Sequence, residues 1–305
     1  MNKCIILCMT CNDPCFIHEM NVIKDTWAKP VLDGKYDNLD IWFYTSGDKN
    51  YIDIDNHIIY VDADDSLYGT WEKTLNTFNI INKYFDYDFI FRTNCSTVIN
   101  CQLLSTFINY LDINTNEFWA IDYMFEKNYI IMKDLNYIIP YGFGIIISNN
   151  IIHKLINNYN IEYLYYNNLI HKYTSDIFSD DNMLALIVNH INEIEQDSIK
   201  YVHFNHAYYK SYDKEFVLQW YNYDVGNTKL DINIFKNVLG VRIKKMNREN
   251  YSYKSDYILS FSEEYKNICE VSNVYNENII DKQELDIISQ NIINNRYNYE
   301  IRIIN

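Results

Sequence analysis

The sequence predicts an α/β fold in which one mixed central sheet is flanked by helices. Short apolar runs typical of buried strands alternate with segments whose apolar residues recur at helical spacing. The runs stop abruptly at polar residues, as strands do at the edge of a sheet. The chain has 305 residues, 48% of them hydrophobic, which is enough to bury one large core. Strands separated by helices predict parallel pairs joined by right-handed crossovers.

The first strand and helix are predicted within the first thirty residues. Lys3 to Met9 is almost entirely apolar and is the expected opening strand, with Thr10 beginning the loop at its carboxyl end. The helix that follows must end before Pro30, because proline cannot continue a helix. Its apolar residues recur at helical spacing, at Phe16, Met20, Ile23 and Trp27.

Two further strands and a second helix are predicted next. The strands are 39–45 and 57–61, and an acidic loop with Asp62, Asp64 and Asp65 follows them. We expect an acidic surface loop there, with a metal site as the alternative. The next helix carries an apolar stripe at Trp71, Leu75, Phe78, Ile81 and Phe85.

The predicted central strand is Tyr87 to Phe91, a run of aromatic and β-branched residues typical of a strand buried on both faces. Polar residues follow it at once. Open α/β sheets bind ligands at the carboxyl ends of their strands, so Arg92 to Thr97 lies where a ligand is expected.

The remaining elements are less regular. We expect a helix near 102–110, strands at 117–123 and 129–132, and a helix at 151–158 with Ser148 at its cap. A helix with Leu285, Ile288 and Ile292 on one face is predicted in the tail. The predicted boundaries are a catalytic domain at 1–228 and an extension at 229–305 packed on it.

Charge and composition exclude several classes of protein. The formal charge of −15 disfavours binding to nucleic acid. No run approaches the roughly 20 apolar residues of a transmembrane helix, so a soluble, cytoplasmic protein is expected. Four of the 7 cysteines cluster at Cys4, Cys8, Cys11 and Cys15. Free thiols in a reducing compartment are expected, with a zinc site as the alternative.

The central segment R-T-N-C-S-T-V-I-N, residues 92–100, resembles the middle of glycosyltransferase family 31, the β-1,3-glycosyltransferases and fringe-like enzymes of GT-A fold. The family's pattern there is close to K-T-D-D-D-V-F-V-N. Other matches follow the same order. I-K-D-T-W-A at 23–28 resembles I-R-x-T-W-G, and D-S-L-Y-G-T-W-E-K-T at 65–74 resembles D-x-Y-x-N-L-T-x-K-T. I-P-Y-G-F-G-I-I-I-S at 139–148 and D-D-N-M-L-A-L-I at 180–187 resemble P-Y-x-S-G-x-G-Y-V-L-S and E-D-V-Y-V-G.

The resemblance implies a GT-A-like fold with a Rossmann-like nucleotide-binding half, and an inverting transfer from a nucleotide-diphosphate sugar, most simply a UDP-sugar. The acceptor is a hydroxyl of a glycan or glycoprotein. Asp181 is then the general base and Asp180 its support, with a plain helix cap as the alternative. Thr10 and Lys73 lie beside the nucleotide; for Lys73 a solvated helix lysine is the alternative.

The acidic triplet that holds a divalent ion in the family is degenerate here. Asn94 and Ser96 stand at its first and third acids. With Arg92, they are expected to contact the nucleotide as hydrogen-bonding groups, or to hold Mn²⁺ or Mg²⁺ weakly. His203, or His206, is the candidate third ligand. Because carboxylates draw such ions into a site, we expect no metal cofactor unless one is retained weakly.

A basic cluster in residues 241–248, V-R-I-K-K-M-N-R, offers a replacement for the ion. If the segment is extended, Arg242 and Lys244 point the same way. We expect both to neutralise the leaving diphosphate, with a solvated basic turn as the alternative. A catalytically inactive GT-A-like module that binds a glycan or nucleotide is the other overall interpretation.

Overall fold

The structure is a computed structural model of the whole chain. It describes residues 1–66, 69–122, 140–158, 179–195, 199–203, 205–208, 219–224 and 238–244, and a few positions in the tail (266, 267, 269, 270, 283, 286 and 287). The predicted strand at 129–132 lies outside these residues, and so does most of the predicted helix in the tail.

The core is an eight-stranded mixed sheet with the order β3-β4-β2-β1-β5-β8-β7-β9. Neighbours from β4 through β2 and β1 to β5 are parallel, whereas β8 runs antiparallel to both β5 and β7. The predicted α/β class with a mixed central sheet is therefore confirmed. The strands are β1 (Cys4–Met9), β2 (Leu39–Gly47), β3 (Tyr51–Asp53), β4 (Ile58–Asp62), β5 (Phe89–Asn94), β7 (Glu117–Asp122), β8 (Pro140–Ser148) and β9 (Lys200–His203).

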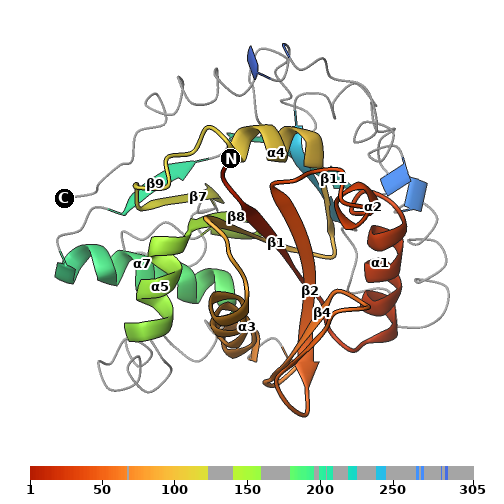
Figure 1. Cartoon of the computed structure of the whole chain (residues 1–305), viewed down its shortest axis with the longest axis horizontal. Coiled ribbons are helices and arrows are strands. Elements are labelled where there is room, and N and C mark those ends of the chain that lie inside the picture. Colours follow the sequence, from red (N-terminus) through yellow and green to blue (C-terminus); the bar gives the residue numbers. More distant parts are fainter. Residues whose placement is uncertain are drawn as a thin grey trace.

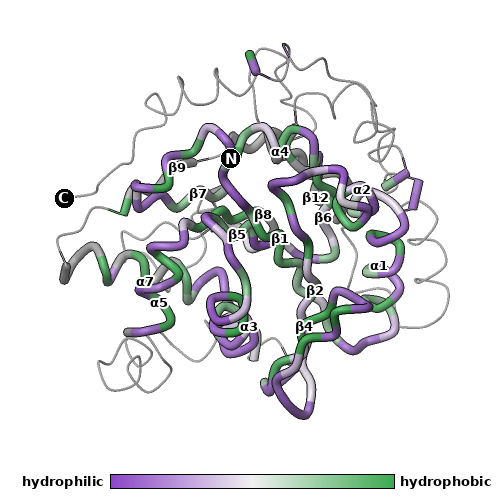
Figure 2. The backbone as a smooth tube through the Cα atoms, in the orientation of Figure 1, coloured by the Kyte–Doolittle hydropathy of each residue, from purple (hydrophilic) through white to green (hydrophobic). Residues whose placement is uncertain are grey.

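Helices cover both faces of this sheet (Figure 1). Alternate residues of β1 face opposite ways, as in any strand, so Ile6 and Cys8 belong to one buried cluster and Ile5 and Leu7 to the other. The first cluster is covered by α1 (Pro14–Asp25), α2 (Lys29–Leu32) and α4 (Cys101–Ile108). The second is covered by α3 (Thr70–Tyr84), α5 (Asn149–Asn158) and α7 (Asp180–Glu195). Figure 2 shows the apolar residues gathered on the central strands.

Local signals in the sequence explain where two helices begin. The side chain of Asp13 accepts a hydrogen bond from the Cys15 amide at 2.8 Å, and Pro14 occupies the first turn of α1. Asn100 does the same for α4 through the Leu103 amide at 3.0 Å. Ser148 directly precedes α5, but its hydroxyl is buried without a hydrogen-bond partner among the described residues. The expected cap therefore makes no hydrogen bond to the helix within that part of the chain.

A second, four-stranded sheet lies beside the first, in the order β10-β11-β12-β6. Its strands are β10 (Asn205–Tyr208), β11 (Gln219–Asp224), β12 (Val238–Lys244) and β6 (Thr97–Ile99). Strand β12 comes from the predicted extension and pairs antiparallel with β6, which follows directly on β5. The division at residue 228 stays a prediction.

The strands predicted at 3–9, 39–45 and 57–61 are present with small shifts of their ends. The central strand differs: β5 begins at Phe89 and continues to Asn94, so Arg92 lies inside the sheet and not in a loop after it. Among the described residues, none of the helices has the length and apolarity needed to cross a membrane.

Candidate functional site

The predicted site residues whose side chains the structure describes gather at the carboxyl edge of the central strands. The amide of Thr10, the residue after β1, donates to the carbonyl of Tyr44 in β2 at 2.9 Å. In the register of the sheet, Met9 lies opposite Asn94 at the end of β5. The ends of β1, β2 and β5 therefore lie side by side, as expected for a ligand crevice in an α/β sheet.

Arg92 and Asp180 form a buried ion pair at this edge. Nη2 of Arg92 lies 2.5 Å from Oδ2 of Asp180, and the two side chains are 1% and 4% exposed. The hydroxyl of Thr74 donates to the same carboxylate at 3.1 Å, and the hydroxyl of Thr70 accepts from the Asp180 amide at 3.2 Å. These contacts fix the start of α7 against β5 and the first turn of α3.

Burial and charge act in opposite directions on this pair. Burial raises the pKa of Asp180 to about 6, although the adjacent Arg92 guanidinium pulls it down. Burial, the largest single effect, would lower the pKa of Arg92, but the Asp180 carboxylate together with Tyr44 and Asp181 outweighs it and raises that pKa above its ordinary value. At neutral pH both groups therefore carry their charges, and the pair is an ionic one.

Arg92 also has unused hydrogen-bonding capacity. Among the described residues, its Nε and Nη1 atoms are buried without a hydrogen-bond partner. A guanidinium has five N–H donors and no acceptor, and an unsatisfied buried donor costs on the order of 1–3 kcal/mol. Arg92 can therefore donate hydrogen bonds to an oxygen of a ligand, because no oxygen of the described residues accepts from these two nitrogen atoms.

Asp181 lies beside Arg92 and is half-buried, whereas Asp180 is buried. A Cβ placed on Gly142 in β8 would lie 2.7 Å from Nη1 of Arg92 and 3.0 Å from Oδ2 of Asp181. Only glycine leaves room for both groups there. The Nδ2 of Asn94 lies 3.5 Å from the Gly142 carbonyl oxygen. Gly142 is thus the point at which Arg92, Asn94 and Asp181 meet.

Asn94 uses its side-chain oxygen to close the turn after β5. That oxygen accepts from the Ser96 amide at 3.2 Å, from the Ser96 hydroxyl at 2.7 Å and from the Thr97 hydroxyl at 3.0 Å. Asn94 and Ser96, both predicted to contact the nucleotide, are therefore hydrogen-bonded to each other. A ligand that uses the Asn94 oxygen has to replace at least one of these bonds.

The residues at this turn do not fit a site for Mg²⁺ or Mn²⁺. Such ions prefer carboxylate oxygens, and the turn offers an amide oxygen already engaged three times, a thiol and a hydroxyl. The described part of the chain holds no group of three or more His, Cys, Asp or Glu side chains that could bind a metal ion. His203 ends β9, and its side chain lies outside what the structure describes.

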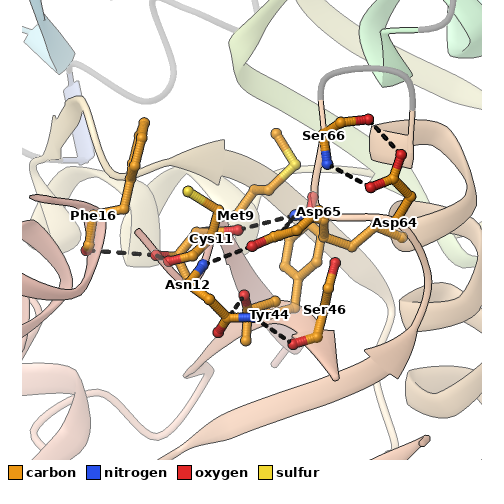
Figure 3. Close-up of polar contacts among 12 residues, drawn as sticks. Met9, Cys11, Asn12, Phe16, Tyr44, Ser46, Asp64, Asp65 and Ser66 are labelled. Atoms are coloured by element: carbon orange, nitrogen blue, oxygen red, sulfur yellow. Dashed lines mark hydrogen bonds and ion pairs between the residues drawn. The ribbon is translucent and has the colours of Figure 1, made fainter. Parts of the chain in front are cut away.

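Lys73 is buried at the same edge and is not a solvated helix lysine, so that alternative is wrong. Its Nζ lies 2.5 Å from Oδ1 of Asp65 and donates to the Thr10 carbonyl at 3.2 Å. The other carboxylate oxygen of Asp65 accepts from the Asn12 amide at 2.7 Å (Figure 3). Lys73 thus joins the loop after β4 to the loop after β1.

The remaining acids of that loop behave as surface residues. Asp62 and Asp64 are exposed. Both the amide and the hydroxyl of Ser66 donate to Asp64, at 3.0 and 2.5 Å (Figure 3). Asp64 therefore closes a local turn, and of the three acids Asp65 is the one that joins the site.

The basic cluster comes close to the turn through the backbone of β12. In the register of the second sheet, Arg242 is the partner of Thr97 and Val241 that of Val98. Thr97 in turn donates to Asn94. The strand that carries Arg242 and Lys244 therefore runs directly beside the turn at Asn94. Both side chains lie outside what the structure describes.

Tyr44, Asp65 and Thr74 are among the contributors to the site that were not predicted. Asp65 and Thr74 are the first and last residues of the D-S-L-Y-G-T-W-E-K-T match, so the motif itself was an available signal. The hydroxyl of Tyr44 lies 3.1 Å from that of Thr74. Burial raises the pKa of Tyr44 to about 12, so its hydroxyl stays protonated at neutral pH.

None of the seven cysteines forms a disulfide, as expected. Cys8 and Cys95 approach each other, with their sulfur atoms 3.9 Å apart behind the turn at Asn94. Cys4 and Cys8 are buried in β1, and Cys11 and Cys15 lie at the start of α1, half-buried.

Comparisons with known proteins find similarity only at the level of solved structures. No family model matches the chain, and no curated protein matches it. A galactosyltransferase, LgtC, in complex with donor and acceptor sugar analogues, has a TM-score of 0.44 and 10% identity, over 86% of this chain and 95% of that one. An active-site mutant of LgtC has a TM-score of 0.43 and 10% identity, with the same coverage of 86% and 95%.

The glycosyltransferase GlyE of Streptococcus pneumoniae TIGR4, in its apo form, has a TM-score of 0.37 and 11% identity, over 99% of this chain and 66% of that one. These values do not assign the chain to a family. The resemblance to family 31 stays a prediction that rests on the sequence motifs.

Proposed function

We propose that this chain is a glycosyltransferase that moves a sugar, with inversion, from a nucleotide-diphosphate sugar to a hydroxyl of a glycan or glycoprotein acceptor. UDP-sugars are the first donors to test, because the sequence motifs resemble those of enzymes that use them. One observation carries the proposal. A half-buried carboxylate, Asp181, lies beside a buried arginine and the end of the central strand, and all three meet at Gly142.

Asp181 is the proposed general base. As the acceptor oxygen attacks the anomeric carbon from the face opposite the diphosphate, the carboxylate takes the hydroxyl proton. One C–O bond forms, the bond from the anomeric carbon to the diphosphate breaks, and the nucleoside diphosphate leaves with the electron pair. A positioned base of this kind contributes typically about 10²–10⁴-fold to a rate.

Asp180 is a positioning residue in this proposal. Its carboxylate is buried and engaged by Arg92 and Thr74, so it has no access to an acceptor hydroxyl. What it provides is the fixed start of α7, from which Asp181 projects.

Cationic side chains are proposed to neutralise the leaving diphosphate. Lys73 is engaged by Asp65, and Arg92 by Asp180, so each is already balanced by one carboxylate. Arg242 and Lys244, on the strand beside the turn at Asn94, supply the additional charge in this proposal. Asn94 and Ser96 contribute neutral hydrogen bonds, and no step is routed through a metal ion.

A binding module without turnover is the second candidate. The side chain of Asn94 is the observation that favours it, because its oxygen already accepts three hydrogen bonds. The family 31 enzymes that the sequence resembles have an acid at this position. Such a module would bind a nucleotide or glycan at the same edge of the sheet and release both unchanged.

A donor screen separates the two candidates. The full chain is incubated with a panel of UDP-sugars, in water alone and with oligosaccharide acceptors, and UDP release is measured beside UDP binding by calorimetry. The proposal expects UDP release from at least one donor. Binding of UDP with no release from any donor establishes the binding module instead.

A further inference from the structure

A hollow of about 430 Å³ lies outside the candidate site, between the edge strand β3 and helix α3. The helix contributes one face to it: Asn76, Asn79, Ile80, Lys83 and Tyr84 follow each other at helical spacing. The residues of α3 that pack on the sheet lie on the other side, among them Phe78 and Ile81. The hollow is therefore lined mainly by the outer face of α3, with Ile80, which also belongs to the buried cluster, at its margin.

Two tyrosines stand exposed at the hollow. The side chain of Tyr84 is 61% exposed and that of Tyr51 is 42% exposed. The ring of Tyr51 is stacked on that of Tyr60, with centroids 4.4 Å apart and planes inclined by 6°, so its position is fixed. The face of an aromatic ring carries negative charge density and attracts the polarised C–H groups of a sugar ring.

Three asparagines in the hollow are fixed by main-chain hydrogen bonds. Asn50 accepts from the Asp62 amide at 2.7 Å, and Asn76 donates to the Asp62 carbonyl at 3.1 Å. Asn79 donates to the Leu75 carbonyl at 3.2 Å. One side-chain amide atom of each is thus engaged, and the other makes no hydrogen bond among the described residues: a donor nitrogen on Asn50 and acceptor oxygens on Asn76 and Asn79. A sugar hydroxyl both donates and accepts, so this mixture suits it.

The charge of the hollow differs from that of the chain. The described residues that line it include Lys83 and no carboxylate, although the chain as a whole has 41 acidic and 26 basic residues. A neutral or anionic ligand is therefore favoured over a cationic one. A peptide strand added to β3 is disfavoured, because that edge has only 3 residues with which to pair.

The candidate site and the hollow lie one after the other along helix α3. Lys73, in the first turn, belongs to the site, and Tyr84, eleven positions later, ends the hollow about 16 Å away at 1.5 Å per residue. Asp62, which holds Asn50 and Asn76, is three positions before Asp65, the partner of Lys73. Helix α3 packs on the part of the sheet formed by β2 and β4 (Figure 1).

We propose that this hollow, between β3 and α3, binds an oligosaccharide, and that it holds the part of an acceptor chain that is remote from the reacting hydroxyl. The role as an acceptor site rests on the proposed function, whereas the binding of an oligosaccharide does not.

The binding test uses the full chain and four hexasaccharide probes: the neutral hexamers of maltose, cellulose and chitin, and a hexasaccharide of hyaluronan. Binding is measured by calorimetry. At least one probe is expected to bind, with its Kd raised about tenfold or more in Tyr84→Ala and in Asn79→Leu. Both side chains are exposed, so the variants are expected to fold. Lys49→Ala, in the loop just before β3 but outside the hollow, is the matched control and is expected to bind as the wild type does.

Two results overturn the proposal: no binding of any of the four probes, or binding that both hollow variants leave unchanged. UDP release from a donor in water reports on the candidate site alone and keeps the two proposals apart. Release of UDP without binding of any oligosaccharide rejects the proposal for the hollow and leaves the proposed transferase activity standing. Binding weakened by Tyr84→Ala, with no turnover of any donor, supports the hollow and rejects the transferase.

Discussion

Arg92 in β5 and Asp180 at the start of α7 form an ion pair with an N–O separation of 2.5 Å and almost no exposure to solvent. The pair joins segments that lie far apart in the sequence. It also fixes the helix start from which Asp181 projects. Removing two charges from water costs free energy that offsets their attraction, so the main effect of the pair is to position the residues of the site and not to stabilise the fold.

Breaking the pair on one side is expected to be strongly destabilising. Arg92→Met or Asp180→Asn leaves the other charge or its partners buried without compensation, at a cost of about 3–5 kcal/mol in the free energy of unfolding. The double variant Arg92→Met with Asp180→Leu removes both charges of the pair. Its loss in the free energy of unfolding is expected to be smaller than the summed losses of the two single variants. Urea denaturation measures all three. Single variants within about 1 kcal/mol of the wild type would contradict the structure here.

Asp180 is also expected to give stability a measurable dependence on pH. Its pKa in the folded state is raised from 3.8 to about 6 by burial. Between these values the folded state binds more protons than the unfolded state, so the free energy of unfolding contributed by Asp180 falls as the pH rises from about 4 to 6. Asp180→Asn is expected to remove this component. Identical slopes for the variant and the wild type over that range would reject it.

Gly142 is expected to tolerate no side chain. A methyl group there would lie 2.7 Å from Nη1 of Arg92 and 3.0 Å from Oδ2 of Asp181, so one of them has to move. Gly142→Ala should lower stability by about 1–3 kcal/mol and sharply reduce sugar transfer. Gly34→Ala is the control: its φ of 73° makes alanine costly there as well, but nothing lies within 4 Å of the added Cβ. Full transfer activity in Gly142→Ala would show that Asp181 does not depend on this contact.

The basic strand β12 is expected to bind the diphosphate in place of a metal ion. Arg242→Ala combined with Lys244→Ala should weaken UDP binding at least about tenfold, and a chelator of divalent ions should leave most of the wild-type binding. Calorimetry with UDP measures both. An unchanged Kd in the double variant would place the cluster elsewhere, and loss of binding with the chelator would show that a metal ion is required.

Much of the sheet follows from the sequence because its strands are continuous apolar runs. Lys3 to Met9 is predicted within a residue of β1. The end of β5 was not predicted, because Arg92 is polar and a polar residue normally ends a buried strand. Here its charge is matched by Asp180, and a pairing over that distance cannot be read from local pattern. The same limit applies to Lys73, whose burial depends on Asp65 and the loop after β1.

The second sheet was unpredictable for a related reason. Thr97 to Ile99 is a strand of only 3 residues, and its partner β12 comes from the far end of the chain. Nothing local in either segment indicates the other. The motif matches nevertheless located Asp180 and Asp181, because they depend on residue identity and order and not on the contacts that surround the pair.

The proposed transfer depends on Asp181 as the general base. The decisive measurement is sugar transfer by Asp181→Asn, which keeps the shape of the side chain and removes its basicity, beside donor binding by calorimetry. This role of Asp181 predicts that transfer falls by about 10²-fold or more while the Kd for the donor changes little. Transfer at the wild-type rate by a variant that binds the donor normally would contradict it.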